Sequence, residues 1–225
     1  MSIEVAIIGG GPAGLMAAEA LIARGHRPHL FDAMPSLGRK FLMAGKSGLN
    51  LTHSEDYPDF VTRFGAVSAD LRAALDAMTP ADIAAWADGL GIKTFTGSSG
   101  RIFPTDFKAA PLLRAWIKRL RDNGLTIHVR HRWTGWNEDG ALMFGTREGV
   151  ATFKADATVL ALGGASWPQL GSDASWVAAL ETRGAIVTPF AAANCGFDVN
   201  WTPFVSERFA GEPVKPVILS FDGES

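Results

Sequence analysis

The chain has 225 residues, an apolar fraction of 47% and a formal net charge of −2. Its length accommodates one large domain, or one domain and part of another, and its apolar content excludes an intrinsically disordered chain. Because both signs of charge are spread along the sequence, charge alone indicates no nucleic-acid surface. The single cysteine, Cys195, excludes an internal disulfide, and we expect it to be a small buried residue rather than a reactive thiol.

Residues 5–23 are apolar enough to suggest a membrane span, but four glycines, a proline and Glu19 interrupt them. The first residues also lack the basic region of a secretory signal peptide. We therefore expect no association with a membrane and a cytoplasmic location.

Residues 3–8 are apolar and β-branched, which is typical of a buried parallel strand, and the helical pattern that follows ends at Gly25. The turn between them has the spacing G-x-G-x-x-G, whose glycines allow a tight turn, close approach of a pyrophosphate and close packing of helix on strand. The N-terminal amides of the helix also attract phosphate. The turn supplies five candidate cofactor-binding residues: Gly9, Gly11, Pro12, Ala13 and Gly14.

A second strand is predicted over residues 27–31, and Asp32 lies at its end. A carboxylate about 20 residues after the glycine turn is typical of the group that binds ribose hydroxyls. The order strand, glycine turn, helix, strand and acid predicts a dinucleotide site, and the alternative is a glycine-rich turn without a ligand. Because the carboxylate would repel a 2′-phosphate, NADP is disfavoured at this site.

A long connection over residues 33–56 follows, and its apolar residues and glycines are not typical of a disordered segment. We expect an ordered loop folded along a ligand, with Arg39 and Lys40 facing a pyrophosphate. Asn50 would bring an amide close to a ring system. The alternative is a solvated Arg-Lys pair on a surface loop.

Helices are predicted over residues 69–78, from the cap at Thr79 to Gly91, and over residues 112–120. The last of these is amphipathic, and we expect its basic face to be solvated rather than to bind RNA. Trp86 is expected to anchor the core rather than to hold a ligand.

Residues 98–104 are predicted as a loop in which Arg101 lies between a turn and an aromatic–proline pair. This arginine either meets a substrate or flavin edge or belongs to a structural turn. A β-meander is predicted next, from short strands over residues 125–129, 132–136, 141–144 and 151–153.

Residues 157–162 predict a buried strand that leads into Gly163 and Gly164. Ligands of open α/β sheets bind beyond the carboxyl ends of the strands, so this glycine pair is well placed to approach a cofactor. Ser172 and Asp173 are then predicted to cap a helix.

The character of the chain changes after residue 188. We predict a first domain over residues 1–188 and the beginning of a β-rich domain over residues 189–225. A strand over residues 213–221 is followed by a hairpin-turn signal without a returning strand, so we expect a truncated piece of a longer protein. The predicted class is α/β: a Rossmann-like, doubly wound parallel sheet with a β-meander and the start of a truncated β-rich inserted domain.

These segments resemble the N-terminal part of the BaiN/RdsA-type NAD(P)/FAD-dependent oxidoreductases, a family of bacterial flavoproteins. The resemblance runs from residue 3 to about residue 225, and it rests on residues 7–14, 38–52, 100–104 and 161–172. Many flavoproteins share the first segment, whereas the second and fourth are far more specific to this family.

The resemblance implies that FAD is bound, with its pyrophosphate at the first glycine turn and its ribose at Asp32. It implies a candidate electron donor, NAD(P)H. Leu162 stands where a typical member has threonine, which removes a hydroxyl near the cofactor but keeps the backbone turn. The residues that the resemblance places at the cofactor beyond the first turn are Asp32, Arg39, Lys40, Asn50, Leu162, Gly163, Gly164 and the backbone near Trp133.

The resemblance further implies hydride transfer through flavin to an unsaturated small molecule, such as a steroid-like acid. One alternative is reduction of uracil in ribosomal RNA, with the RNA contacts in the missing part. Another is a cofactor-binding module that retains FAD weakly and has no activity, and a last one is a dehydrogenase that uses NAD alone. The five histidines are scattered without a metal-ligand or nucleophile pattern, so no catalytic residue is assigned.

Overall fold

The computed structural model describes residues 2–65, 69–191 and 199–212. The chain divides into two compact units, residues 1–188 and residues 189–225. Among the described residues, no helix combines the length and the hydropathy that crossing a membrane would require.

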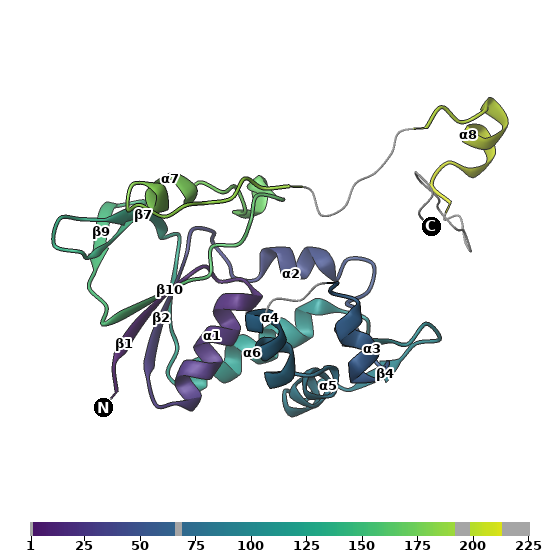
Figure 1. The fold of residues 1–225 in the computed structure, drawn as a ribbon, viewed down its shortest axis with the longest axis horizontal. Coiled ribbons are helices and arrows are strands. Elements are labelled where there is room, and N and C mark those ends of the chain that lie inside the picture. The colour runs from purple at the N-terminus through teal and green to yellow at the C-terminus, as the bar shows by residue number, and fades with distance from the viewer. Residues whose placement is uncertain (1, 66–68, 192–198, 213–225) are drawn as a thin grey trace. The chain divides into compact units, whose positions relative to one another are not determined.

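A four-stranded parallel sheet forms the centre of the first unit (Figure 1). The chain runs outward from β1 through β2 to β6 and then returns to place β10 on the other side of β1. The winding therefore reverses between β1 and β10, which is where such sheets bind ligands. The predicted Rossmann-like α/β fold is confirmed. The strands are β10 (Ala157–Leu160), β1 (Glu4–Ile8), β2 (Arg27–Asp32) and β6 (Thr126–Val129), in that order.

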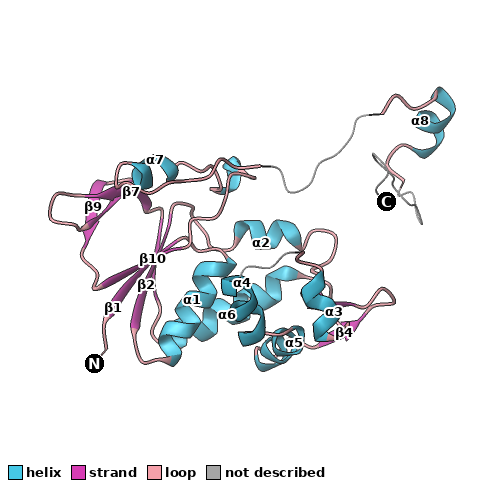
Figure 2. Ribbon diagram, viewed as in Figure 1, coloured by secondary structure: helices cyan, strands magenta, loops and turns pink. Residues whose placement is uncertain are grey.

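The sheet separates two layers because neighbouring side chains on a strand point to opposite faces. Ile7 and Leu30 pack with the helices α1 and α6, whereas Ile8 and Phe31 pack with an antiparallel meander. Figure 2 shows the two long helices on one side of the sheet and the meander with α7 on the other. The elements of these layers are α1 (Pro12–Ala23), α6 (Ala109–Asp122), β7 (Arg132–Trp136), β8 (Leu142–Thr146), β9 (Gly149–Phe153) and α7 (Val177–Glu181).

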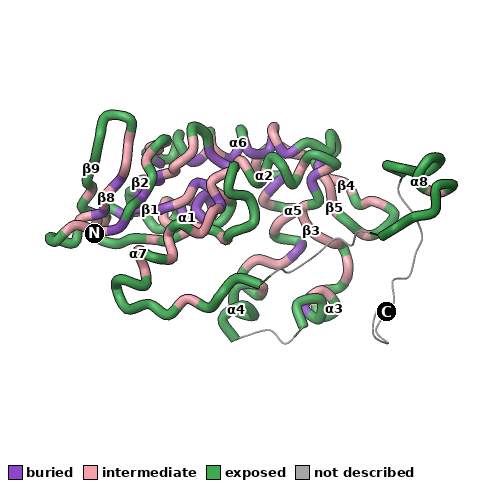
Figure 3. Tube along the Cα trace, turned by 90° about the horizontal axis from the view of Figure 1, so that it is seen from above, coloured by how far each residue is buried: buried purple, intermediate pink, exposed green. Residues whose placement is uncertain are grey.

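The buried positions concentrate on β1, α1 and α6 (Figure 3). Leu112, Trp116 and Leu120 of the predicted apolar stripe are all buried on α6. Trp86 packs edge-on against Trp116, with ring centroids 4.8 Å apart. Its expected place in the core is thereby confirmed.

A helical region with a small antiparallel sheet adjoins these layers. Its helix α5 (Pro80–Gly89) begins at a capping box. The Thr79 hydroxyl accepts from the Asp82 backbone amide, and the Asp82 carboxylate accepts from the Thr79 backbone amide. The cap at Thr79 is as predicted. The elements are α2 (Arg39–Ala44), α3 (Tyr57–Thr62), α4 (Ala69–Ala77), α5 (Pro80–Gly89), and the strands β3 (Thr52–His53), β5 (Arg101–Pro104) and β4 (Thr94–Thr96).

Two segments that were predicted as loops contain regular structure. The connection over residues 33–56 includes α2 and β3, and residues 98–104 include the strand β5, which pairs with β4. A six-residue helix and a four-residue strand are too short to show a hydrophobic period, so tertiary packing decides their conformation.

Two predicted strands differ in their surroundings. Residues 126–129 join the parallel sheet beside β2 rather than the meander. The strand β10 is mostly exposed rather than buried, and Leu160 is 38% exposed. It is one of the two edge strands of the described sheet, with β1 as its neighbour, so its residues lack the cover that a central strand has.

The predicted cap of α7 is wrong. The Asp173 carboxylate accepts from the backbone and the hydroxyl of Ser175, which closes a turn before the helix begins at Val177. In the second unit, α8 spans Pro203–Phe209. The predicted strand over 213–221, its hairpin turn and Cys195 lie outside the described residues.

Candidate cofactor site

A cavity of about 450 Å³ opens at the carboxyl ends of β1, β2 and β10. Its walls come from the glycine turn after β1, the chain after β2, the start of α2, the start of β7 and the loop after β10. Ten residues predicted from sequence line it: Gly9, Gly11, Pro12, Ala13, Asp32, Arg39, Lys40, Trp133, Leu162 and Gly163.

The other three predicted residues do not line the wall. Gly14 is buried beneath the turn, where a Cβ atom would lie 1.9 Å from the Gly9 carbonyl oxygen, so it serves the packing of helix on strand. Gly164 is not among the lining residues, and its carbonyl accepts a hydrogen bond from the Ser172 hydroxyl. Asn50 is exposed beside β3, between residues whose amides pair with Phe107 and Ile102.

Gly9 and Gly11 of the turn differ in backbone conformation and in the space that a Cβ atom would have. Gly9 has a φ of +112°, and a Cβ atom there would lie 2.2 Å from the Ala161 carbonyl oxygen, so the fold itself excludes a side chain. Gly11 has a φ of −81° and a ψ of −176°, which any residue adopts, and a Cβ atom there would meet no atom within 4 Å. A side chain at residue 11 would instead occupy the cavity. The bare backbone at Gly11 therefore fits a ligand that approaches it closely.

The N-terminus of α1 faces the same space. The helix begins at Pro12 with Gly11 as its cap residue, and it has no side-chain cap and no acidic residue in its first turn. The first amides of any helix lack intrahelical acceptors, and here no cap side chain takes their place. The helix dipole also places partial positive charge at this end. This arrangement suits a phosphate group.

Asp32 is held in a fixed orientation by backbone groups. One carboxylate oxygen accepts from the Gly10 amide and the other from the Met34 amide, each at 2.7 Å. Burial raises the pKa of Asp32, although these two hydrogen bonds and the charges of Arg39 and Arg132 oppose that rise. A carboxylate has about four acceptor positions, so Asp32 retains capacity for the hydroxyls of a ligand.

The cavity wall carries more positive than negative charge. Arg132 forms an ion pair with Asp173 at 3.1 Å. Within the described part of the chain, neither Arg39 nor Lys40 forms an ion pair. The Arg39 Nε atom is buried and has no hydrogen-bond partner among those residues. Two unpaired cations on one wall fit an anionic ligand.

The meander side of the cavity is aromatic. Phe31, His131, Trp133 and Trp176 line it, and Trp133 is 8% exposed. The Trp133 Nε1 atom finds no hydrogen-bond partner among the residues that the structure describes. Flat apolar side chains at this wall suit a planar ring.

Several wall residues were not predicted from the sequence. His131, Arg132 and Ser172 line the cavity, and the His131 amide donates to the Asp32 carbonyl at 2.9 Å. No local pattern marks His131 and Arg132, and Ser172, at the end of the segment 161–172, was predicted only as a helix cap. Residues 2–65, 69–191 and 199–212 contain no group of three or more metal-ligating side chains that could hold a metal ion.

Comparisons with known proteins give one family and several relatives. The model of a family described as the HI0933-like protein Rossmann domain matches residues 3–201. A 3-dehydro-bile acid delta(4,6)-reductase from Clostridium scindens is 29% identical over 213 residues, which cover 89% of this chain and 49% of the relative. The chain thus spans about half the length of this curated relative.

Solved structures share the fold at low sequence identity. A 3-ketosteroid-delta4-(5alpha)-dehydrogenase from Rhodococcus jostii RHA1 is 13% identical with a TM-score of 0.55, and the match covers 72% of this chain and 46% of the other. The Sdh1 complex of Mycobacterium smegmatis in its apo form is 20% identical with a TM-score of 0.55, and here the shares are 73% and 34%. At these identities the similarity concerns the fold alone.

Proposed function

The chain belongs to the family of the HI0933-like Rossmann domain, the BaiN/RdsA-type FAD-dependent oxidoreductases, and from this membership we propose that its cavity binds FAD. The observation that carries the proposal is Gly11, where the fold leaves room for a side chain and the chain nevertheless keeps bare backbone on the cavity wall. In this proposal the Gly11 backbone and the first amides of α1 hold the pyrophosphate. Arg39 and Lys40 balance its charge.

The remaining wall residues fit the other parts of the same ligand. Asp32 would accept hydrogen bonds from ribose hydroxyls, and its negative charge disfavours a 2′-phosphate at that position. Trp133 would flank the adenosine end. Each role uses a group that the described contacts leave available.

When bound, the flavin supplies hydride transfer, while the protein supplies binding, orientation and electrostatics. We propose that the whole protein reduces an unsaturated small molecule with a steroid-like skeleton, with NAD(P)H as the electron donor. The name of the Clostridium scindens relative, a reductase of a 3-dehydro-bile acid, supports this substrate class. Modification of ribosomal RNA has no supporting observation in the described residues. Reoxidation of the chemically reduced flavin by a conjugated 3-keto steroid, and not by its saturated analogue, tests the substrate class.

A matched pair of glycine substitutions tests the binding of FAD. Gly11→Ala places a methyl group in the cavity, whereas Gly89→Ala places one on α5, where the nearest atom is 3.9 Å away. We expect Gly11→Ala to raise the dissociation constant of FAD about tenfold or more, because the methyl group crowds the ligand. Titration of the purified protein with FAD, followed by flavin fluorescence, measures the constant.

Two results would contradict the proposal. One is a wild-type protein that does not bind FAD, and the other is a Gly11→Ala variant that binds it as the wild type does. Because alanine is a poorer N-cap than glycine, Gly11→Ala should also cost under about 1 kcal/mol of stability. The thermal midpoint therefore has to be measured beside the affinity, and Gly89→Ala should leave the affinity unchanged.

A further inference from the structure

Ser172 stands out among the described residues as the single polar side chain that is almost completely buried, with 4% of its surface exposed. It lies on the cavity wall, at the end of the loop that follows β10. A buried hydroxyl needs hydrogen-bond partners to offset its loss of water. Its O–H group donates to the Gly164 carbonyl at 2.8 Å, and its oxygen accepts from the Lys40 ammonium at 3.2 Å.

The backbone of Ser172 closes the same loop. Trp167 and Ser172 exchange two backbone hydrogen bonds, at 3.2 and 3.1 Å, across the 3-10 helix η1 (Pro168–Leu170). Gly171 has a φ of +89°, and a Cβ atom there would lie 2.9 Å from the Met34 side chain. The loop is consequently fixed to itself and to the chain after β2.

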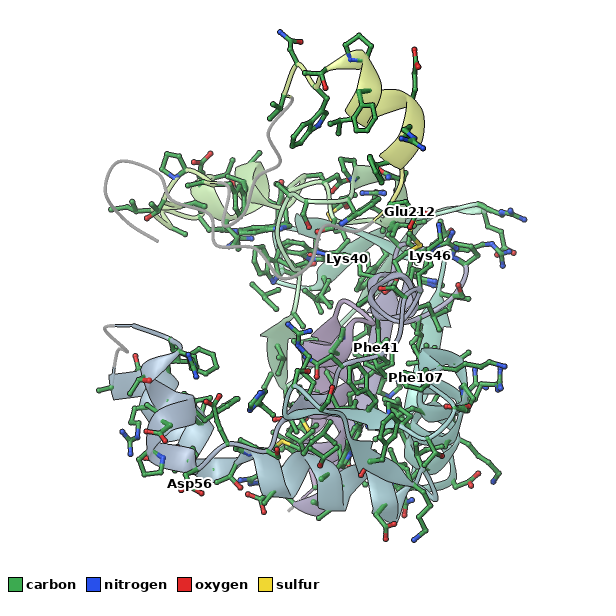
Figure 4. All side chains as sticks on the ribbon, turned by 90° about the vertical axis from the view of Figure 1, so that its right-hand side faces the viewer. Lys40, Phe41, Lys46, Asp56, Phe107 and Glu212 are labelled. Atoms are coloured by element: carbon green, nitrogen blue, oxygen red, sulfur yellow. The ribbon has the colours of Figure 1, made fainter. Side chains whose placement is uncertain are left out.

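Lys40 joins this loop to α2. Its ammonium group donates to the Ser166 hydroxyl at 2.9 Å and to the Ser172 hydroxyl at 3.2 Å. Figure 4 shows Lys40 and Phe41 on different sides of α2, and Phe41 packs against the core. An ammonium group has three N–H donors, and Lys40 forms no ion pair within the described part of the chain. One donor and the full charge thus remain for a ligand in the cavity.

We propose that Ser172 is a positioning residue for the cofactor, which fixes the Gly163–Gly164 backbone at the cavity and directs the remaining donor of Lys40 toward an anionic group of bound FAD. This inference rests on the proposed function. Ser172 acts through Lys40 and Gly164, and it needs no contact with the ligand. A free lysine side chain loses rotamer entropy when it binds, so a lysine held in place beforehand binds an anion more tightly.

The test is a double-mutant cycle on the dissociation constant and the dissociation rate of FAD. Ser172→Ala removes both hydrogen bonds of the hydroxyl, and we expect the dissociation constant to rise about tenfold to a hundredfold. In a Lys40→Met background the same substitution should cost at least about threefold less, because the part that acts through Lys40 is already lost. Ser98→Ala, in the exposed turn between β4 and β5, is the control that should leave binding unchanged.

The thermal midpoint of each variant without FAD separates positioning from folding. Should Ser172→Ala not fold, Ser172→Cys keeps the shape of the side chain at a slightly larger volume, replaces the hydroxyl by a weak donor and is expected to bind FAD more weakly than the wild type. Two results would overturn the inference while FAD binding stands. One is that Ser172→Ala raises the dissociation constant of FAD by the same factor in the wild-type and Lys40→Met backgrounds. The other is that the position-172 variants bind FAD with wild-type affinity. A wild-type protein that does not bind FAD would overturn the inference and the proposed function together.

Discussion

At the scale of single residues, the cavity combines groups that the fold needs with groups that the fold leaves available. Gly9 and Gly14 are required by close backbone contacts, whereas Gly11 is not. Asp32 has its two oxygens held by backbone amides, and Arg39 keeps a buried donor without a partner among the described residues. Available groups gathered on one wall indicate a ligand more strongly than the glycine spacing does alone.

The raised pKa of Asp32 has a consequence for stability without a ligand. A carboxyl group whose pKa is higher in the folded than in the unfolded protein stabilises the fold below its unfolded pKa. That contribution is lost as the pH rises through the folded pKa. We therefore expect the wild type to lose stability relative to Asp32→Asn as the pH rises from the ordinary aspartate range toward neutrality. Urea unfolding of both proteins across that range measures the difference.

The same substitution should weaken FAD binding about tenfold or more, because a charged acceptor for the ribose hydroxyls is lost. Asp156→Asn is a suitable control, since the Asp156 carboxylate also accepts a backbone amide, that of Glu4, but lies exposed. A stability difference between wild type and Asp32→Asn that does not change with pH would contradict the assignment of a raised pKa.

At the scale of elements, one carboxylate connects three helices on the helical face of the sheet. Glu19 of α1 accepts from the Trp86 indole of α5 at 3.2 Å and from the Trp116 indole of α6 at 2.6 Å. It also pairs with Arg119 of α6. The network therefore holds α1, whose N-terminus faces the cavity, against α5 and α6.

Glu19→Ala leaves two indole donors and a guanidinium without their acceptor, and we expect it to lower the free energy of unfolding by about 2 to 4 kcal/mol. As the control, Lys118→Ala breaks the exposed ion pair between Lys118 and Asp122 of α6, and it should lower the free energy of unfolding by under about 1 kcal/mol. Chemical denaturation of the two variants compares them. Equal midpoints for Glu19→Ala and Lys118→Ala would show that the network does not join the helices.

At the scale of the whole molecule, the sequence predicts best what is local along the chain. About 30 consecutive residues contain the strand β1, the glycine turn, α1, β2 and Asp32, and this order is a known sequence motif. The amphipathic pattern of α6 and the cap of α5 are local as well, and both were predicted. The family was also recognisable from four short segments.

What the sequence does not predict is set by tertiary contacts. Residues 126–129 have the composition of a meander strand, yet they pair with β2 in the parallel sheet. The contact of Lys40 with Ser166 and Ser172 joins segments 126 and 132 residues apart, so no spacing rule could reveal it. Asn50 matches the family segment but lies away from the cavity.

Amide hydrogen exchange of the purified protein, with and without FAD, measures whether FAD occupies the cavity beyond β1, β2 and β10. Exchange reports local opening, so a bound ligand slows it where the backbone is held. We expect added FAD to slow exchange at residues 9–14, 31–34, 38–40, 161–164 and 170–173, and to leave β4 and β5 unchanged. Slowed exchange centred on residues 94–107, with no change at residues 9–14, would contradict this expectation.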